Sequence, residues 1–309
     1  MVGAEVTHTA RAKAKKVGKI LFLTLFVLFL VGEGLVLVFV PDLRSIVQSD
    51  PQLSYRLKPN TCCRIYSYLR FEKRIIHYCT GELGQRVSAE GAAPLDQRPT
   101  IACFGDSNTW GDGLEDEEAY PAQLGALLPD NQVLNFGVSG YNAYQELWSA
   151  RRYLASATPA LVIQQLCQND DDPAFQMPAA DRLLPPTLLG RLCWTMYNIR
   201  KQKKPPLDAA HAIAELAATC RQKHAPLVLY VMSRPPSLRD VDWGVWRRQG
   251  VCVLDGAQIR FVSSRDYHPD QHLSADGNAR LAYALVHTMK TCGLLTDAAT
   301  GAAAPSAGR

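Results

Sequence analysis

The stretch TIACFGDSNTWG, residues 100–111, indicates what kind of fold this sequence forms. Its apolar half ends at Gly105, a pattern typical of a buried strand followed by a tight turn. Asp106 and Ser107 come directly after that turn, where a helix would begin. The N-terminus of a helix offers free N–H groups and positive potential, which suit a serine whose attack creates an oxyanion. An Asp or Ser that only caps the helix fits the stretch equally well.

Four more apolar runs come after this stretch, and amphipathic segments separate them. We expect further strands at residues 131–137, 160–167, 226–233 and 250–255. We expect helices at residues 118–128, 142–156 and about 207–223, and a last helix with Ser274 as N-cap that ends near Lys290. This alternation predicts right-handed βαβ units and one five-stranded parallel sheet covered by helices on both faces. In such sheets, ligands bind at the carboxyl ends of the strands, near a topological switch point.

Polar clusters follow the next two predicted strands. Residues 135–141, NFGVSGY, contain glycines that let the backbone approach a ligand and donate an N–H. Asn169, within QND at 168–170, carries an amide that can donate to the same oxyanion. Each of these two clusters also fits an ordinary turn when it is considered alone.

A fourth cluster, DYHPDQHLSADG at residues 266–277, holds His268 and His272 just before the last helix. A histidine in such a loop can act as general base to a serine, with a carboxylate that fixes its tautomer. Two tandem Asp-x-His units also suit a metal ion, but no further His or Cys cluster accompanies them. We therefore expect no metal.

Together, the four clusters resemble the SGNH (GDSL-type) hydrolases, a family of esterases, lipases and acetylesterases. GDSNTWG is similar to the first conserved block of that family, NFGVSG to the second, QND to the third and DQHLSADG to the last. The blocks occur in the family's order within residues 99–290, and four ordered motifs are jointly more specific than each alone. The resemblance implies a flavodoxin-like three-layer α/β/α sandwich and acyl-ester chemistry without a metal or other cofactor.

By position, the resemblance makes Ser107 the nucleophile and His272 the base. It assigns the oxyanion hole to the N–H groups of Ser107 and Gly140 and to the side chain of Asn169. His272 is preferred over His268 because Leu-Ser-x-x-Gly follows it, as in the family.

Two positions depart from the family's pattern. Cys167 stands where the third block usually has a glycine. Pro269 stands where the last block usually has the aspartate that partners the histidine. Asp270, two residues before the base, is then the expected carboxylate, and Asp266 and His268 are the fallback acid and base.

The N-terminus predicts a membrane anchor. Residues 20–40, ILFLTLFVLFLVGEGLVLVFV, contain one charge, and a helix of that length spans the roughly 30 Å hydrocarbon layer of a bilayer. The basic residues that precede this run place residues 1–19 in the cytoplasm by the positive-inside rule. We expect a single-pass protein whose catalytic domain lies on the periplasmic, extracytoplasmic side. A cleaved signal peptide fits the same pattern, but the long run and the lack of a small-x-small cleavage site favour an anchor.

The remaining chain divides by composition. Residues 41–98 form a membrane-proximal segment with a few short strands packed against the hydrolase domain, which spans residues 99–293. Within that domain, residues 171–205 are an insertion that fits either a lid over an acyl pocket or an extra packed helix. Residues 294–309 have no apolar face and are expected to be a disordered tail.

Charge and cysteine usage exclude other classes of protein. The formal net charge is +4, and residues 1–19 carry all of it (five basic residues minus one acidic), so the body offers no basic surface for nucleic acid. None of the nine cysteines forms a CxxC pair, so a zinc or redox motif is not expected. In an oxidising compartment, Cys79 can bridge to Cys62 or Cys63. The other cysteines beside apolar runs are expected to be buried hydrophobic side chains: Cys103, Cys167, Cys220 and Cys252.

These observations predict a membrane-anchored serine esterase or lipase-like hydrolase. Its partner would be an acyl ester, O-acetyl esters included, on a lipid, a small molecule or a glycan. Two alternatives stay open on the sequence. One is an acyltransferase that modifies envelope polysaccharide with the same residues, and the other is a catalytically silent, membrane-tethered binding module.

Overall fold

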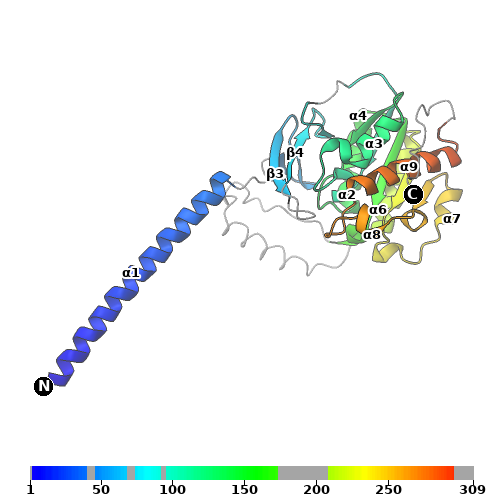
Figure 1. Cartoon of the computed structure of the whole chain (residues 1–309). Helices are drawn as coiled ribbons and strands as arrows, with labels where there is room; N and C mark the ends of the chain where they lie inside the picture. The colour runs from blue at the N-terminus through cyan, green and yellow to red at the C-terminus, as the bar shows by residue number, and fades with distance from the viewer. Residues whose placement is uncertain (1, 40–45, 68–73, 92–94, 173–207, 296–309) are drawn as a thin grey trace.

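A computed structural model of the chain describes residues 2–39, 46–67, 74–91, 95–172 and 208–295. One long helix, α1 (Val2–Phe39), extends from an α/β body that holds the other described elements (Figure 1). Within α1, the segment Lys15–Leu35 has a mean hydropathy of 2.0 over 21 residues and is long enough to cross a membrane, a property that signal sequences share. Nearly all of the predicted insertion at 171–205 and of the predicted tail at 294–309 lies outside the described residues.

The body is built on an eight-stranded sheet with the order β10-β9-β8-β6-β7-β5-β4-β3. Five neighbouring strands are parallel and match the five predicted from the sequence: β6 (Thr100–Phe104), β7 (Gln132–Asn135), β8 (Leu161–Leu166), β9 (Leu227–Val231) and β10 (Cys252–Asp255). Numbered along the chain, these five strands run 2-1-3-4-5 across the sheet, which is the flavodoxin-like order. The predicted α/β class is thereby confirmed.

Three antiparallel strands extend this sheet beyond β7. They are β3 (Cys62–Ser67), β4 (Arg74–Thr80) and β5 (Arg86–Val87). A separate two-stranded hairpin, β1 (Val47–Asp50) and β2 (Ser54–Leu57), precedes them. The sheet therefore continues into the segment that precedes the parallel strands. Hydrophobic periodicity did not reveal this, because it does not show which strands pair, and the connecting strand β5 has only two residues.

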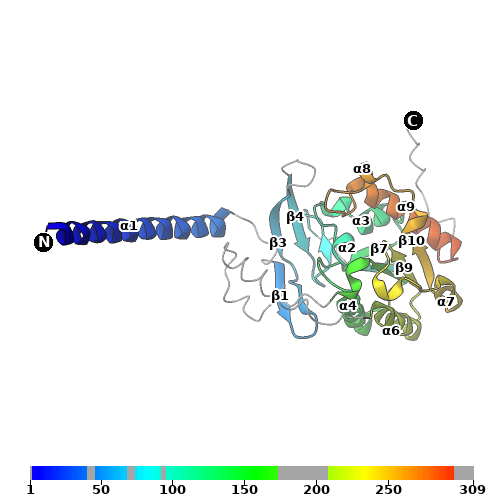
Figure 2. The same ribbon diagram turned by 90° about the horizontal axis from the view of Figure 1, so that it is seen from below.

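Helices cover both faces of the sheet and give three layers (Figure 2). One face carries α4 (Ala143–Ser156), α6 (Ala209–Gln222) and α7 (Trp243–Arg248), and the other carries α3 (Tyr120–Leu127) and α9 (Ala275–Thr291). Successive side chains of a strand point to opposite faces, so Ala102 and Phe104 enter one core and Ile101 and Cys103 the other. The predicted helices are present, and Ser274 caps α9 by accepting from the Gly277 N–H. The shorter helical turns are α2 (Ser107–Trp110), η3 (Asp116–Glu118), η4 (Gln168–Asp171), η6 (Pro236–Leu238), η7 (Gly256–Gln258) and α8 (Ser263–Asp266).

A third apolar cluster joins the β1–β2 hairpin and β4 to the loops that leave the parallel strands. Its buried members are Ile46, Leu53, Tyr55, Leu57, Ile76, Tyr78, Trp110, Val138 and Tyr141. The β1–β2 hairpin and β4 are therefore packed against the parallel part of the body, and they contact the segments that follow β6 and β7.

The structure contains two disulfides within its described residues. Cys62 bonds to Cys79, which confirms the predicted bridge and selects one of its two possible partners. Cys252 is buried as expected, but the interpretation of its side chain as a small hydrophobe is wrong, because it bonds to Cys292 at the end of α9. A separation of 40 residues gave no spacing signal for that bond. The remaining expected thiols are buried and free: Cys103, Cys167 and Cys220.

Candidate active site

Ser107 lies at the first position of α2, directly after β6. Gly105 makes this turn possible, because a Cβ there would lie 2.1 Å from Thr109 Oγ1 and 2.5 Å from Gln165 Oε1. Asp106 caps the helix: its Oδ1 accepts from the Asn108 N–H at 2.9 Å, and its side chain is buried. A tight turn and a cap thus fix the position of the serine hydroxyl.

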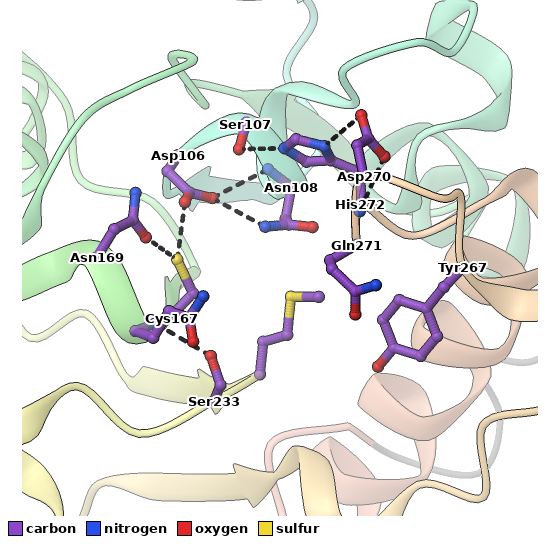
Figure 3. A pocket seen from close by; sticks show the side chains of 12 residues that line it. Asp106, Ser107, Asn108, Cys167, Asn169, Ser233, Tyr267, Asp270, Gln271 and His272 are labelled. Carbon is purple, nitrogen blue, oxygen red and sulfur yellow. Dashed lines mark hydrogen bonds and ion pairs between the residues drawn. The ribbon is translucent and has the colours of Figure 1, made fainter. Parts of the chain in front are cut away.

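His272 reaches Ser107 from the loop before α9 (Figure 3). The distance from His272 Nε2 to Ser107 Oγ is 2.8 Å, and that from His272 Nδ1 to Asp270 Oδ2 is 3.0 Å. The His272 N–H also donates to Asp270 Oδ1 at 3.3 Å. The three side chains form a continuous row in which a proton can pass from hydroxyl to imidazole while the carboxylate holds the other ring nitrogen.

The loop that carries His272 is a tight turn. The His268 N–H donates to the His272 carbonyl at 2.8 Å, and the Gln271 N–H donates to the His268 carbonyl at 3.0 Å. Gln271 itself has a φ of +72°, in the left-handed region. This conformation folds the Asp270 carboxylate back onto the imidazole, so one intervening residue suffices where the family's pattern has two.

The two fallback residues do not line the site. Asp266 is fully buried and accepts from Arg280 Nε at 3.0 Å and from the Val262 N–H at 2.6 Å, so it ties the loop to α9. His268 contributes its backbone to the turn and is nearly buried. Neither belongs to the residues that surround the cavity beside Ser107.

Three hydrogen-bond donors expected at the oxyanion hole remain available. Within the described part of the chain, the N–H groups of Ser107 and Gly140 donate to no protein acceptor. Asn169 lines the cavity, and its Oδ1 contacts Cys167 Sγ. The amide nitrogen of Asn169 therefore points away from Cys167 (Figure 3). Gly140 is not among the cavity-lining residues; it lies in the neighbouring loop, which Gly137 packs against the backbone of α2.

Cys167 occupies the position where a glycine is usual. Its Sγ lies 2.8 Å from Asp106 Oδ2, besides the contact with Asn169. Burial, and then the nearby carboxylates of Asp106 and Asp170, raise the pKa of the Cys167 thiol. The thiol therefore keeps its proton and serves as a hydrogen-bond donor beneath the site, not as a thiolate nucleophile.

A cavity of about 390 Å³ opens beside Ser107 and His272. Its lining residues are Asp106, Ser107, Asn108, Cys167, Gln168, Asn169, Met232, Ser233, Tyr267, Asp270, Gln271 and His272. No motif marks Met232 and Ser233 in the sequence, although they follow β9 and so lie at the carboxyl edge of the sheet, where site residues are expected. Tyr267 and Gln271 were also missed, since only the fold shows which residues of the last cluster face the cavity.

Two carboxyl groups lie buried below this cavity. Burial first, and then the charges of Asp170 and Asp106, raise the pKa of Glu146. Burial first, and then the charge of Asp106, raise the pKa of Asp170. Asp170 Oδ2 accepts from the Cys167 N–H at 2.7 Å, and Gln164 Nε2 donates to Glu146 Oε2. Among the residues that the structure describes, no group of three or more His, Cys, Asp or Glu side chains is placed to hold a metal ion.

Comparison with known proteins gives one family and several solved structures. The model of the GDSL-like lipase/acylhydrolase family matches residues 103–280, from β6 into α9. No curated protein matches the chain. Among solved structures, TesA is 20% identical, and the match covers 62% of this chain and 99% of that chain with a TM-score of 0.44. AlinE4, an SGNH-hydrolase family esterase, is 20% identical, and the match covers 64% of this chain and 97% of that chain with a TM-score of 0.39. The psychrotrophic esterase EstA from Pseudoalteromonas sp. is 15% identical, and the match covers 62% of this chain and 97% of that chain with a TM-score of 0.42.

Proposed function

Because the chain belongs to the GDSL-like lipase/acylhydrolase family, we propose that it is a membrane-anchored serine hydrolase of acyl esters. Ser107 is its nucleophile, His272 its general base and Asp270 the carboxylate that partners the base. One observation carries this proposal: Ser107 Oγ lies 2.8 Å from His272 Nε2, and Asp270 Oδ2 lies 3.0 Å from His272 Nδ1. Ser107 and His272 are 165 residues apart in the sequence, so the fold makes their contact.

These positions support the following reaction. His272 Nε2 takes the proton of Ser107 as Oγ attacks the ester carbonyl carbon. The tetrahedral intermediate collapses, and the imidazolium gives its proton to the departing alkoxide, which leaves an acyl group on Ser107. Water, deprotonated by the same imidazole, then attacks the acyl-enzyme and releases the acid. Asp270 is 40% exposed, so its main contribution is to hold the imidazole in one tautomer and orientation.

Charge on the carbonyl oxygen is stabilised by donors that are fixed before the reaction. The N–H groups of Ser107 and Gly140 and the Nδ2 of Asn169 form the oxyanion hole. Their lack of protein acceptors among the described residues supports this role for the two N–H groups. Removal of one such donor typically costs about 10²–10³-fold in rate.

The substrate is an acyl ester with a short chain. The cavity of about 390 Å³ is near the small end of ligand sites, and its lining combines Met232 and Tyr267 with polar groups. This volume suits a small acyl group, such as an O-acetyl group, on a lipid, a small molecule or a glycan.

Membrane attachment places the active site outside the cytoplasm. The basic residues before the apolar helix keep residues 1–19 on the cytoplasmic side, and the α/β body lies on the periplasmic side. The disulfides Cys62–Cys79 and Cys252–Cys292 support this side, because such bonds persist in oxidising compartments.

Ester turnover by the full-length protein in detergent tests the proposal. We expect Ser107→Ala to abolish hydrolysis of a short-chain ester and Asn169→Ala to lower kcat by about 10²–10³-fold, while both variants keep their circular dichroism spectrum. Ser156→Ala, an exposed serine at the end of α4, serves as the matched control and should retain activity. Normal turnover by Ser107→Ala contradicts the proposal. Acylation of an added acceptor sugar in place of hydrolysis would instead favour an acyltransferase.

A further inference from the structure

The β1–β2 hairpin of the membrane-proximal segment packs on the loop that carries Gly140. Tyr55 of β2 is buried and contacts Tyr141 edge to face, with ring centroids 5.2 Å apart. The Tyr141 hydroxyl donates to the Tyr55 carbonyl oxygen at 2.6 Å. Hairpin and loop are thus joined by residues 86 positions apart in the sequence.

A second hydrogen bond runs in the opposite direction and reaches the peptide group between Ser139 and Gly140. The Tyr55 hydroxyl donates to the Ser139 carbonyl oxygen at 2.7 Å. That oxygen and the Gly140 N–H belong to the same peptide group, which is planar. A donor on the carbonyl therefore fixes the direction of the N–H. It also polarises the peptide group, which strengthens the N–H as a donor.

From this geometry we propose that Tyr55 is a positioning residue of the oxyanion hole, which acts by orienting the Gly140 N–H. The inference rests on the proposed function, in which Gly140 stabilises the oxyanion. Tyr55 itself does not touch the substrate. Tyr55 lies outside residues 103–280, the part of the chain that matches the family.

Two properties of the contact support this role. Burial, followed by the charges of Asp112 and Asp106, raises the pKa of Tyr55, so the hydroxyl stays protonated and can only donate to a carbonyl. Gly140 has a φ of +80°, and a Cβ there would lie 2.9 Å from the Tyr55 hydroxyl oxygen. The close approach and the backbone conformation both require glycine at this position.

The same segment also holds the loop that follows Ser107. Arg86 of β5 is fully buried, and its guanidinium donates to three backbone carbonyls of that loop, those of Trp110, Gly111 and Leu114. Ser139 Oγ donates to Asp112 Oδ2 at 2.7 Å, so the two loops are joined to each other as well. The loop that carries Ser139 and Gly140 is thus held by other contacts as well. The specific contribution of the Tyr55 hydroxyl is to set the direction of the peptide group between Ser139 and Gly140.

A pair of Tyr→Phe variants tests the proposal in the full-length protein. Tyr55→Phe removes only the hydroxyl on the Ser139 carbonyl, and Tyr141→Phe removes a buried hydrogen bond of similar length at the same interface. We expect Tyr55→Phe to lower kcat for a short-chain ester by about tenfold, since one of three oxyanion donors is misdirected but not removed. KM should change by less than about twofold, because the ground-state carbonyl binds weakly to these donors. Tyr141→Phe should keep kcat within about twofold of wild type.

The melting temperature, followed by circular dichroism, separates the outcomes. Both variants should show a similar decrease in melting temperature, because each loses one buried hydrogen bond. A similar kcat for the two variants overturns the role of Tyr55, even if both are less stable than wild type. If folded wild-type protein neither hydrolyses esters nor reacts with a serine-directed probe, the proposed function itself fails. If wild type and Tyr141→Phe are active while Tyr55→Phe is slow with an unchanged KM, the inference holds.

Discussion

Gln271 has a left-handed backbone conformation between the carboxylate and the imidazole of the site. With a φ of +72°, it lets Asp270 contact both the N–H and the Nδ1 of His272. The sequence showed that Asp270 and His272 are separated by one residue, and Asp266 remained a second candidate. Which aspartate contacts His272 depends on the φ angle of Gln271, and a glutamine in the sequence does not predict a positive φ.

The conformation of Gln271 can be tested by two substitutions that both remove its side chain from the cavity. Glycine adopts a positive φ freely, whereas a β-branched residue in the left-handed region pays at least about 1–2 kcal/mol. We expect Gln271→Gly to keep kcat within about threefold of wild type and Gln271→Val to lower it by about tenfold or more, because the turn opens and the imidazole loses its carboxylate.

Steady-state ester hydrolysis with both variants measures this effect. Equal kcat values for the glycine and valine variants would show that the turn does not hold the catalytic geometry. A crystal structure of Gln271→Val with the Asp270–His272 contact intact would lead to the same conclusion.

At the scale of elements, α4 and η4 bring two carboxyl groups together beneath the site. Glu146 lies on α4 and Asp170 on η4, and both are buried. Their pKa values are raised in the folded protein, so the unfolded chain releases protons that the folded chain retains. The contribution of these two groups to stability is therefore fully present below the ordinary carboxyl pKa range, and it is lost as pH rises through that range toward the raised values.

Glu146→Gln is expected to reduce the loss of folding stability that occurs as pH rises. Glutamine keeps an oxygen that accepts from Gln164 and supplies an N–H₂ group that can face an ionised Asp170. We expect its melting temperature to exceed that of wild type at pH 8 by about 2–4 °C for each kcal/mol recovered, and the difference to shrink at pH 5. Glu82→Gln, at an exposed position, is the control and should leave the pH dependence unchanged. A pH-independent difference between Glu146→Gln and wild type contradicts the raised pKa.

The strands and helices that could be predicted from the sequence are those marked by a local pattern, such as an apolar run or a helix cap. Apolar runs gave the five parallel strands within a residue or two, and the Ser274 cap gave the start of α9. The two-residue strand β5 and the bond between Cys252 and Cys292 had no such pattern. They depend on which segments meet in space, and local periodicity carries no information about that.

At the scale of the whole molecule, the segment that precedes the family-matched span is part of the α/β body. Arg86 pairs with Asn135 and so joins β5 to β7, and the hairpin residue Tyr55 reaches the loop after β7. The four motifs located Ser107, Asn169 and His272 from sequence because each follows or precedes a well-patterned element. The supporting residues came from a segment with no motif, so only the structure identified them.

The central claim is that Ser107 is an activated nucleophile. Full-length protein in detergent, treated with a fluorophosphonate probe and measured by intact mass, tests it directly. We expect one adduct per chain on wild type, mapped to Ser107 by peptide digestion, the same adduct on Ser156→Ala, and none on Ser107→Ala. Folded wild-type protein without an adduct, or an adduct that persists in Ser107→Ala, would contradict this claim and favour a membrane-tethered binding module.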